Sequence, residues 1–175
     1  MRRQTVNQKM NIVFLILGMS FVWVDSLFSH CEIPCGIYND EARLALLEEH
    51  TVTIEKSMKE IEALSQKAPY NFNQITRWVK NKDKHASELQ HIVTQYFMTQ
   101  RIQPVDSQNT KIYQDYVKEL ALLHEMLIYA MKAKQTTDLA HVQKLRTLVT
   151  AFRTSYLSPK VSRGLQTSQI TEKSK

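Results

Sequence analysis

The sequence predicts an all-α protein, an antiparallel up-down-up-down four-helix bundle, and three observations lead to that prediction. Glycine, which destabilises helices, occurs only three times in 175 residues. Apolar residues recur at spacings of three and four along four long segments, which is the pattern of amphipathic helices. Prolines and a helix cap leave only short connections between the segments, so neighbouring helices should run antiparallel. Together the four segments occupy residues 40–158.

The first two helices are predicted over about residues 40–66 and 73–101. Pro69 and Pro104 follow them, and proline cannot continue a helix. Each segment has one apolar face that should pack into the core. The residues of these faces are Leu47, Ile54, Met58 and Ile61 in the first helix, and Ile75, Trp78, Val79, Leu89, Ile92, Tyr96 and Phe97 in the second.

The third helix is predicted to start near Asp106-Ser107. The fourth is predicted to start at Thr137-Asp138, whose residue types cap helix N-termini. Pro159 ends the bundle, and the polar residues 159–175 are predicted to form a disordered tail. The expected apolar faces are Tyr113, Val117, Leu120, Leu127 and Met131 in the third helix, and Leu139, Val142, Leu145, Val149, Phe152 and Tyr156 in the fourth.

Residues 1–29 have the composition of a cleaved signal peptide. A basic start is followed by an apolar run from Met10 to Val24, and Ser29 is a small residue at the cleavage position. The run is shorter than the ~20 residues that a membrane-spanning helix needs. We therefore expect cleavage by a signal peptidase, export to a periplasmic or extracellular location, and no stable membrane insertion afterwards. An uncleaved membrane anchor and an organellar transit peptide are the alternatives.

Directly after this leader lies the segment His30-Cys31-Glu32-Ile33-Pro34-Cys35-Gly36-Ile37-Tyr38, which holds both cysteines of the chain. Cleavage after Ser29 would free the α-amine of His30. This amine, the Cys31 amide nitrogen and the Cys31 thiolate would close two five-membered rings around a metal, and Cys35 would add a second thiolate. Such a planar set of nitrogen and sulfur donors suits Ni(II) or Cu(II) rather than tetrahedral Zn(II). The His30 imidazole could bind as an axial ligand.

The sequence allows three interpretations other than a planar nickel or copper site with a catalytic role. In an oxidising compartment Cys31 and Cys35 could form a disulfide instead of binding metal. The same donors could serve an N-terminal copper or nickel carrier that performs no turnover. A di-metal carboxylate bundle would need two Glu-x-x-His motifs, and the sequence offers only the one at Glu88–His91.

The pattern His-Cys-x-x-Pro-Cys-Gly-x-Tyr resembles the N-terminal hook of the nickel superoxide dismutase family. Weaker likeness, at Tyr96-Phe97 and Lys132–Ala140, extends the resemblance over roughly residues 30–157. The resemblance implies a four-helix bundle whose hook, residues 30–39, binds one nickel ion per subunit through His30, Cys31 and Cys35. It implies conversion of superoxide to O₂ and H₂O₂ by Ni(II)/Ni(III) cycling, in a homohexamer.

The resemblance also assigns residues around the metal. Tyr38 corresponds to a catalytic tyrosine that guards the open face of the metal and hydrogen-bonds the oxygen species through water, and Tyr96 corresponds to the second catalytic tyrosine of that gate. The alternative for Tyr38 is that it only holds the hook against the bundle. Pro34 stiffens the turn between the cysteines. His85 aligns with an arginine that braces the axial imidazole in better-known members; a hydrogen-bonded core imidazole is the alternative for His85.

The net charge of the chain is +6, and it becomes +4 without the leader, which carries three basic residues and one acid. A positive protein attracts a small anion such as superoxide. Because basic and acidic residues are mixed along the helices, the sequence predicts no nucleic-acid partner. It also contains no glycine-rich nucleotide loop.

Overall fold

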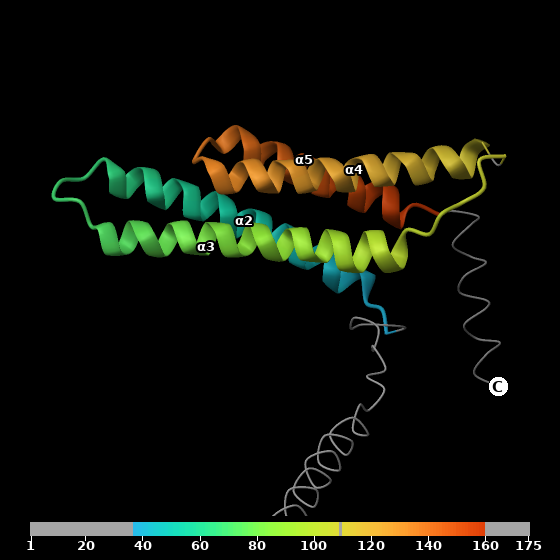
Figure 1. Ribbon diagram of the computed structural model, residues 1–175, viewed down its shortest axis with the longest axis horizontal. Helices are drawn as coiled ribbons and strands as arrows, with labels where there is room; N and C mark the ends of the chain where they lie inside the picture. The colour runs from blue at the N-terminus through green and yellow to red at the C-terminus, as the bar shows by residue number, and fades with distance from the viewer. Residues whose placement is uncertain (1–36, 109, 160–175) are drawn as a thin grey trace, which may run out of the picture. The chain divides into compact units, whose positions relative to one another are not determined.

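The computed structural model describes residues 37–108 and 110–159, and within them it confirms the four-helix bundle. The helices are α2 (Asp40–Ser65), α3 (Phe72–His91) with its continuation η1 (Ile92–Arg101), α4 (Thr110–Gln135) and α5 (Leu139–Leu157). Helix α2 packs against α3 and α5, and α3 packs against α4, so the helices run up, down, up and down (Figure 1). The leader, the hook residues up to Gly36 and the tail from residue 160 lie outside the described residues.

Polar caps set three of the helix starts. The side chain of Asn39 accepts a hydrogen bond from the Ala42 amide, and Asn71 does the same for Gln74. Asp138, predicted as a cap, accepts from the Ala140 amide. These bonds satisfy amides that have no partner inside the helix.

The third helix begins later than predicted. Asp106, at the predicted start, accepts a hydrogen bond from the Gln108 amide within a turn, and α4 starts at Thr110.

The predicted core faces of the first and fourth helices are confirmed. That of the third is confirmed only at Leu120 and Leu127, which are partly buried and pack against the core. Tyr113, Val117 and Met131 are 38%, 44% and 41% exposed. The buried face of α4 contains instead Leu123, Met126, Ala130 and Ala133. Two members of this face are alanines, which let neighbouring helices approach closely, and a pattern that weighs large apolar residues overlooks them.

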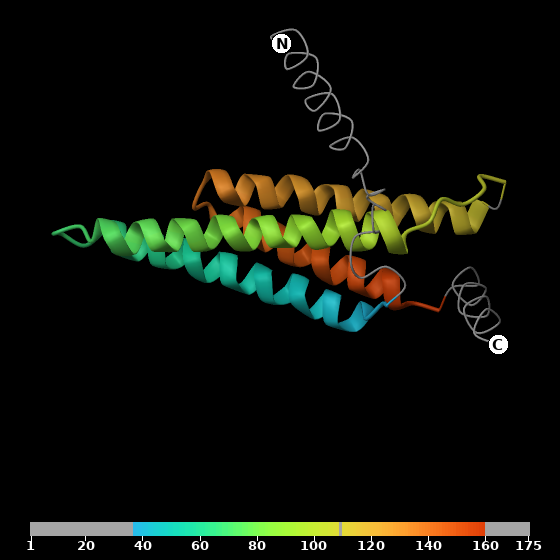
Figure 2. The ribbon, with the colours of Figure 1, turned by 60° about the horizontal axis from the view of Figure 1, so that its bottom comes forward.

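Ile75 and Val79 of α3 are also not buried, and the arrangement of the hairpins explains this. The α2–α3 hairpin projects beyond the turn between α4 and α5, so its far end has no helices opposite it (Figures 1 and 2). Among the described residues, every member of the buried core cluster lies between Leu44 and Tyr156.

The second predicted helix changes type before it ends. Over Ile92–Arg101 the chain forms a π-helix, in which the Ile102 amide bonds the Phe97 carbonyl at 2.8 Å, five residues earlier. Side chains reinforce the wider turns, because Thr99 bonds the Thr94 carbonyl at the same spacing. Long π-helices are rare and often occur at functional sites.

A buried lysine joins the second and third helices. Lys82 is 3% exposed, and its Nζ donates to the carbonyls of Ala133 and Lys134, both at 2.6 Å. These carbonyls belong to the last turn of α4, where no amide of the helix reaches them. The charge also lies at the negative end of the helix dipole.

We predict that Lys82→Met lowers the free energy of unfolding by about 2 kcal/mol, because two buried carbonyls lose a charged donor. Urea unfolding followed by circular dichroism measures the change. Lys80→Met is the matched control on the same helix; Lys80 is exposed, and the control should change stability by less than about 0.5 kcal/mol. Equal losses in the two variants would contradict the capping role.

Candidate functional site

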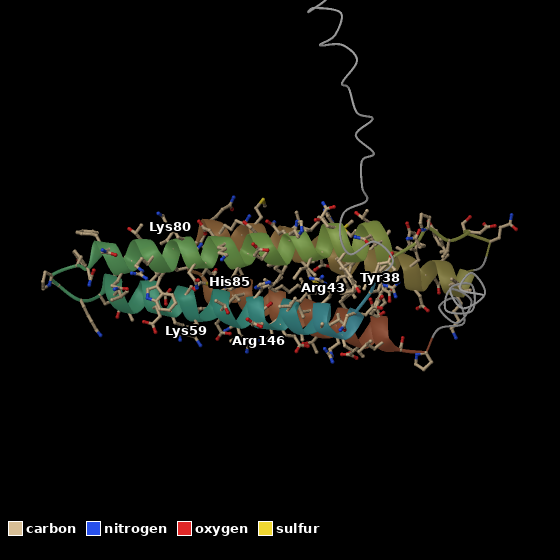
Figure 3. All side chains as sticks on the ribbon, turned by 90° about the horizontal axis from the view of Figure 1, so that it is seen from below. Tyr38, Arg43, Lys59, Lys80, His85 and Arg146 are labelled. Atoms are coloured by element: carbon tan, nitrogen blue, oxygen red, sulfur yellow. The ribbon has the colours of Figure 1, made fainter. Side chains whose placement is uncertain are left out.

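The fold brings together the two tyrosines that the sequence singled out. Tyr38 precedes α2 and is partly buried, whereas Tyr96 lies in η1 and is 3% exposed. Their ring centroids are 6.0 Å apart with an interplanar angle of 77°, an edge-to-face contact. Tyr38 marks this end of the bundle in Figure 3. The pair therefore joins the residue that leaves the hook to the π-helical segment.

One carboxylate braces this pair. Asp40, the first residue of α2, accepts from the Tyr96 hydroxyl at 2.6 Å and from the Tyr156 hydroxyl at 2.8 Å. Arg101 adds a two-pronged contact, from Nε to Oδ1 at 2.9 Å and from Nη2 to Oδ2 at 2.7 Å. Four donors on one carboxylate tie together the start of α2, the end of η1 and the end of α5.

These contacts fix the protonation states of the cluster. Burial pushes the pKa of Asp40 up, but the hydrogen bonds from Arg101, Tyr96 and Tyr156 outweigh it and hold the pKa below its usual value. Burial and the bond to Asp40 raise the pKa of Tyr156 to about 12 and raise that of Tyr96 as well. At neutral pH the carboxylate is thus ionised, both tyrosines are protonated, and the Tyr96 proton lies on the side of Asp40.

Two arginines place positive charge on the tyrosine rings. The Arg101 guanidinium carbon lies 4.4 Å from the centroid of Tyr38, and that of Arg43 lies 5.3 Å from the centroid of Tyr96. Cations in these positions are held by the ring faces. Because Asp40 neutralises Arg101, Arg43 is the residue of this group that supplies net positive charge beside the pair.

Sequence reasoning missed Asp40, Arg101, Tyr156 and Arg43. Asp40 and Arg101 were interpreted only as the ends of their helices, and Tyr156 only as a core residue. An aspartate next to the hook could have been a signal, but its partner lies 61 residues away in the sequence. No local pattern connects residues at that separation.

His85 lies elsewhere along the bundle. Its Nδ1 is 2.8 Å from the Nδ1 of His50, and the ring centroids are 5.1 Å apart. It precedes Tyr96 by eleven residues on one continuous helix, which corresponds to roughly 16 Å along the axis, and Figure 3 shows it well apart from Tyr38. The described contact of His85 is thus a histidine pair between α2 and α3; its role toward the hook stays a prediction.

The predicted metal ligands His30, Cys31 and Cys35, and Pro34 between them, precede the described residues. Within residues 37–108 and 110–159, no group of three or more histidine, cysteine or acidic side chains is placed to hold a metal ion. In the same part of the chain, none of the helices combines the length and apolarity needed to cross a bilayer.

Comparison with known families identifies the protein. The model of the family described as nickel-containing superoxide dismutase matches residues 25–160, which is most of the chain. The protein is therefore a metal-dependent oxidoreductase built on a helical bundle. It belongs to the nickel-containing superoxide dismutase family, so its cofactor is nickel and its substrate is superoxide. Comparisons with curated proteins and with solved structures found no match.

We predict that Asp40→Asn lowers the free energy of unfolding by about 2 kcal/mol, because it removes the anion that Arg101 faces. Urea unfolding measures the loss. Glu41→Gln is the control, since the adjacent Glu41 pairs with Arg153 at the exposed surface and should contribute less than about 1 kcal/mol. If the two variants lost the same stability, the cluster around Asp40 would not be a structural brace.

The histidine pair predicts a dependence of stability on pH. Burial and then the charge of His85 lower the pKa of His50 below 6.5, and the weaker opposing effects of Glu49 and Glu88 do not restore it. The unfolded chain therefore binds the proton at higher pH than the folded chain. His50 adds stability that is complete above about pH 6.5 and is lost as pH falls through the folded pKa.

Urea unfolding at pH 7.5 and at lower pH should show a steeper loss of stability in the wild type than in His50→Gln. His124→Gln, a change at an exposed histidine, should keep the wild-type slope. A His50→Gln slope that equals the wild-type slope would contradict this assignment.

Proposed function

We propose that the protein dismutes superoxide to O₂ and H₂O₂ at an N-terminal hook, residues 30–39, that is exposed when residues 1–29 are removed. The ligands would be the α-amine and imidazole of His30, the Cys31 amide and thiolate, and the Cys35 thiolate. Nickel bound there would supply a one-electron Ni(II)/Ni(III) couple that is alternately reduced and oxidised by superoxide. The donor set fits this task, because thiolates and an amide nitrogen donate enough charge to make the trivalent state accessible.

The observation that carries the proposal is the braced tyrosine pair, together with the short stretch of chain between Tyr38 and the proposed metal ligands. Cys35 precedes Tyr38 by three residues, a span of at most about 11 Å. The proposed metal ligand Cys35 would therefore lie close to the Tyr38–Tyr96 contact. Since Asp40 and Arg101 hold both rings, this contact is a fixed neighbour for whatever the hook binds.

The tyrosines would control access. Two rings in edge-to-face contact would narrow the approach to the metal. A narrow approach favours a diatomic anion over larger ligands, and it limits oxidation of the thiolates by peroxide. Tyr96 already donates its proton to Asp40, so its oxygen can only accept a further hydrogen bond. Tyr38 would then be the hydroxyl that donates a proton at its Oη to an oxygen species through water.

Charge would help to bring in the substrate. Arg43 adds a cation beside Tyr96, and the net charge without the leader is +4. A positive surface raises the encounter rate of a small anion and makes it sensitive to salt. Assembly into a homohexamer with one nickel ion per subunit, export, and processing by a signal peptidase belong to the same proposal.

We predict that Cys31→Ser or Cys35→Ser abolishes turnover without changing the helix content, because both cysteines precede the four described helices, whose described core lies between Leu44 and Tyr156. Rapid mixing of nickel-loaded protein with superoxide measures turnover, and circular dichroism measures helix content. Ile37→Val is the control, since Ile37 is 81% exposed and its side chain is no metal donor. A cysteine variant with more than a trace of activity would contradict the hook.

Two further proteins in the same assay test processing and separate an enzyme from a carrier. A chain with an extra Met before His30 should lose nickel and activity, because its amine is displaced. His30→Ala keeps the amine, the amide and both thiolates, so it should retain nickel while turnover falls steeply. A processed wild type that binds nickel but does not consume superoxide would instead be a carrier.

A further inference from the structure

The far end of the α2–α3 hairpin exposes aromatic side chains. Tyr70 and Phe72 are 54% and 71% exposed, and their ring centroids lie 5.9 Å apart. They sit where the chain turns from α2 into α3, on the part of the hairpin that projects beyond the α4–α5 turn (Figure 1). We call Tyr70 and Phe72 the aromatic tip. Two adjacent exposed rings on a projecting turn are costly in water unless another surface receives them.

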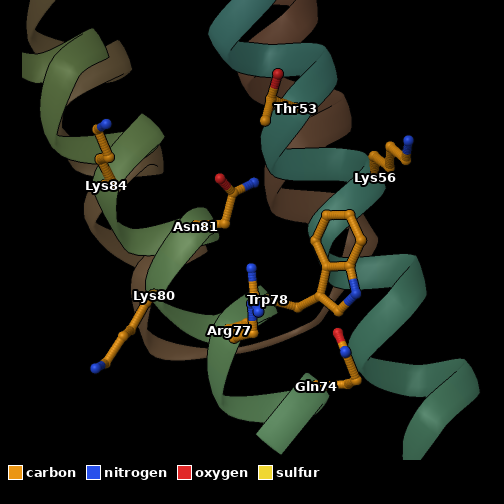
Figure 4. A pocket seen from close by; sticks show the side chains of 8 residues that line it. All are labelled: Thr53, Lys56, Gln74, Arg77, Trp78, Lys80, Asn81 and Lys84. Atoms are coloured by element: carbon orange, nitrogen blue, oxygen red, sulfur yellow. The ribbon is translucent and has the colours of Figure 1, made fainter.

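A basic groove of about 770 Å³ lies beside this tip, between α2 and α3. Figure 4 shows its lining from both helices, with no acidic side chain among the residues. The groove is lined by Thr53, Lys56, Gln74, Arg77, Trp78, Lys80, Asn81 and Lys84. Four of these eight residues are cations.

These four cations are not matched by carboxylates of the described residues. Within the described part of the chain, no ion pair is formed by any of the four, which are Lys56, Arg77, Lys80 and Lys84. Lys56 does lie 5.8 Å from the ring centroid of Trp78. Some basic residues elsewhere on the surface do have partners, as Lys144 has in Glu125. The groove therefore carries a local excess of positive charge that can attract an anionic partner.

We propose that the aromatic tip and the basic groove together form a docking surface for an anionic phospholipid bilayer. Aromatic rings are favourable at the level of lipid headgroups, and nearby lysines and arginines bind the negative leaflet. Nucleic-acid binding is less well supported, because the two most exposed rings lie on the convex tip rather than along the groove where bases would stack. A second copy of this surface is disfavoured by repulsion between the two sets of cations.

Docking by the tip would leave the tyrosine pair accessible. Helix α2 starts next to Tyr38 and ends near Tyr70, and its 26 residues correspond to roughly 39 Å. The two sites thus lie at opposite ends of one helix. This attachment is peripheral and differs from insertion of the leader.

Vesicle binding tests the proposal in the chain that starts at His30. The described core lies between Leu44 and Tyr156, and the apolar run of the segment before His30 would itself bind lipid. Trp23 is removed with that segment, so Trp78 is the single tryptophan and reports from the groove. The protein should co-sediment with vesicles of phosphatidylcholine and phosphatidylglycerol but not with phosphatidylcholine alone, and the Trp78 emission should shift to the blue.

Two double variants examine the two parts of the surface. Lys80→Gln with Lys84→Gln should weaken binding roughly tenfold or more, and Tyr70→Ser with Phe72→Ser should weaken it at least fivefold. Lys111→Gln with Lys118→Gln removes the same charge from exposed positions on α4 and should bind like the wild type.

Three outcomes would overturn the proposal. The first is absence of wild-type binding to the anionic vesicles at low salt, with or without binding to polyphosphate or RNA. The second is an equal loss in the α4 control, which would reduce the effect to net charge. The third is a tip variant that binds vesicles like the wild type but changes the oligomeric state in sedimentation velocity, which would make the tip a subunit contact.

Discussion

The contact on which the candidate site depends is the one between Asp40 and Arg101. It joins the first residue of α2 to the last residue of a π-helix 61 positions later, and it adds Tyr156 from α5. Neither side chain is fully buried, since Asp40 is 23% and Arg101 is 21% exposed. The pair therefore avoids the full cost of desolvating two charges. Its two hydrogen bonds still fix the orientation of the Arg101 and Asp40 side chains toward each other. The tyrosine pair and the chain leading out of the hook are positioned by it.

Much of the bundle follows from local sequence features. Asp138 was predicted to cap the fourth helix, and it does. The predicted core residues of the first helix are buried, namely Leu47, Ile54, Met58 and Ile61. The third helix shows the limit of this approach. Its buried face includes Ala130 and Ala133, and a small residue carries little information about which way it faces until the neighbouring helix is known.

The candidate site could also be predicted only in part, but the reason differs from that given for the third helix. The hook motif pointed to Tyr38 and, by resemblance, to Tyr96, and the fold brings these two together. The contacts of Asp40, Arg101 and Tyr156 around them could not be predicted, because these residues come from three helices. Each of them could also be explained as a helix end or as a core residue. His85 is a related case: the resemblance assigned it to brace the axial imidazole of the hook, but its described partner is His50.

The π-helix has a consequence for comparing this chain with its relatives. Each of its turns encloses one residue more than an α-turn, so residues 92–101 act as an insertion that is absorbed inside a helix rather than in a loop. Helical phase therefore changes between His85 and Arg101. A relative with a plain α-helix here would present its equivalent of Arg101 from a different position in its sequence. An alignment that keeps constant spacing from Tyr96 in both directions would then pair residues that do not face the same neighbours.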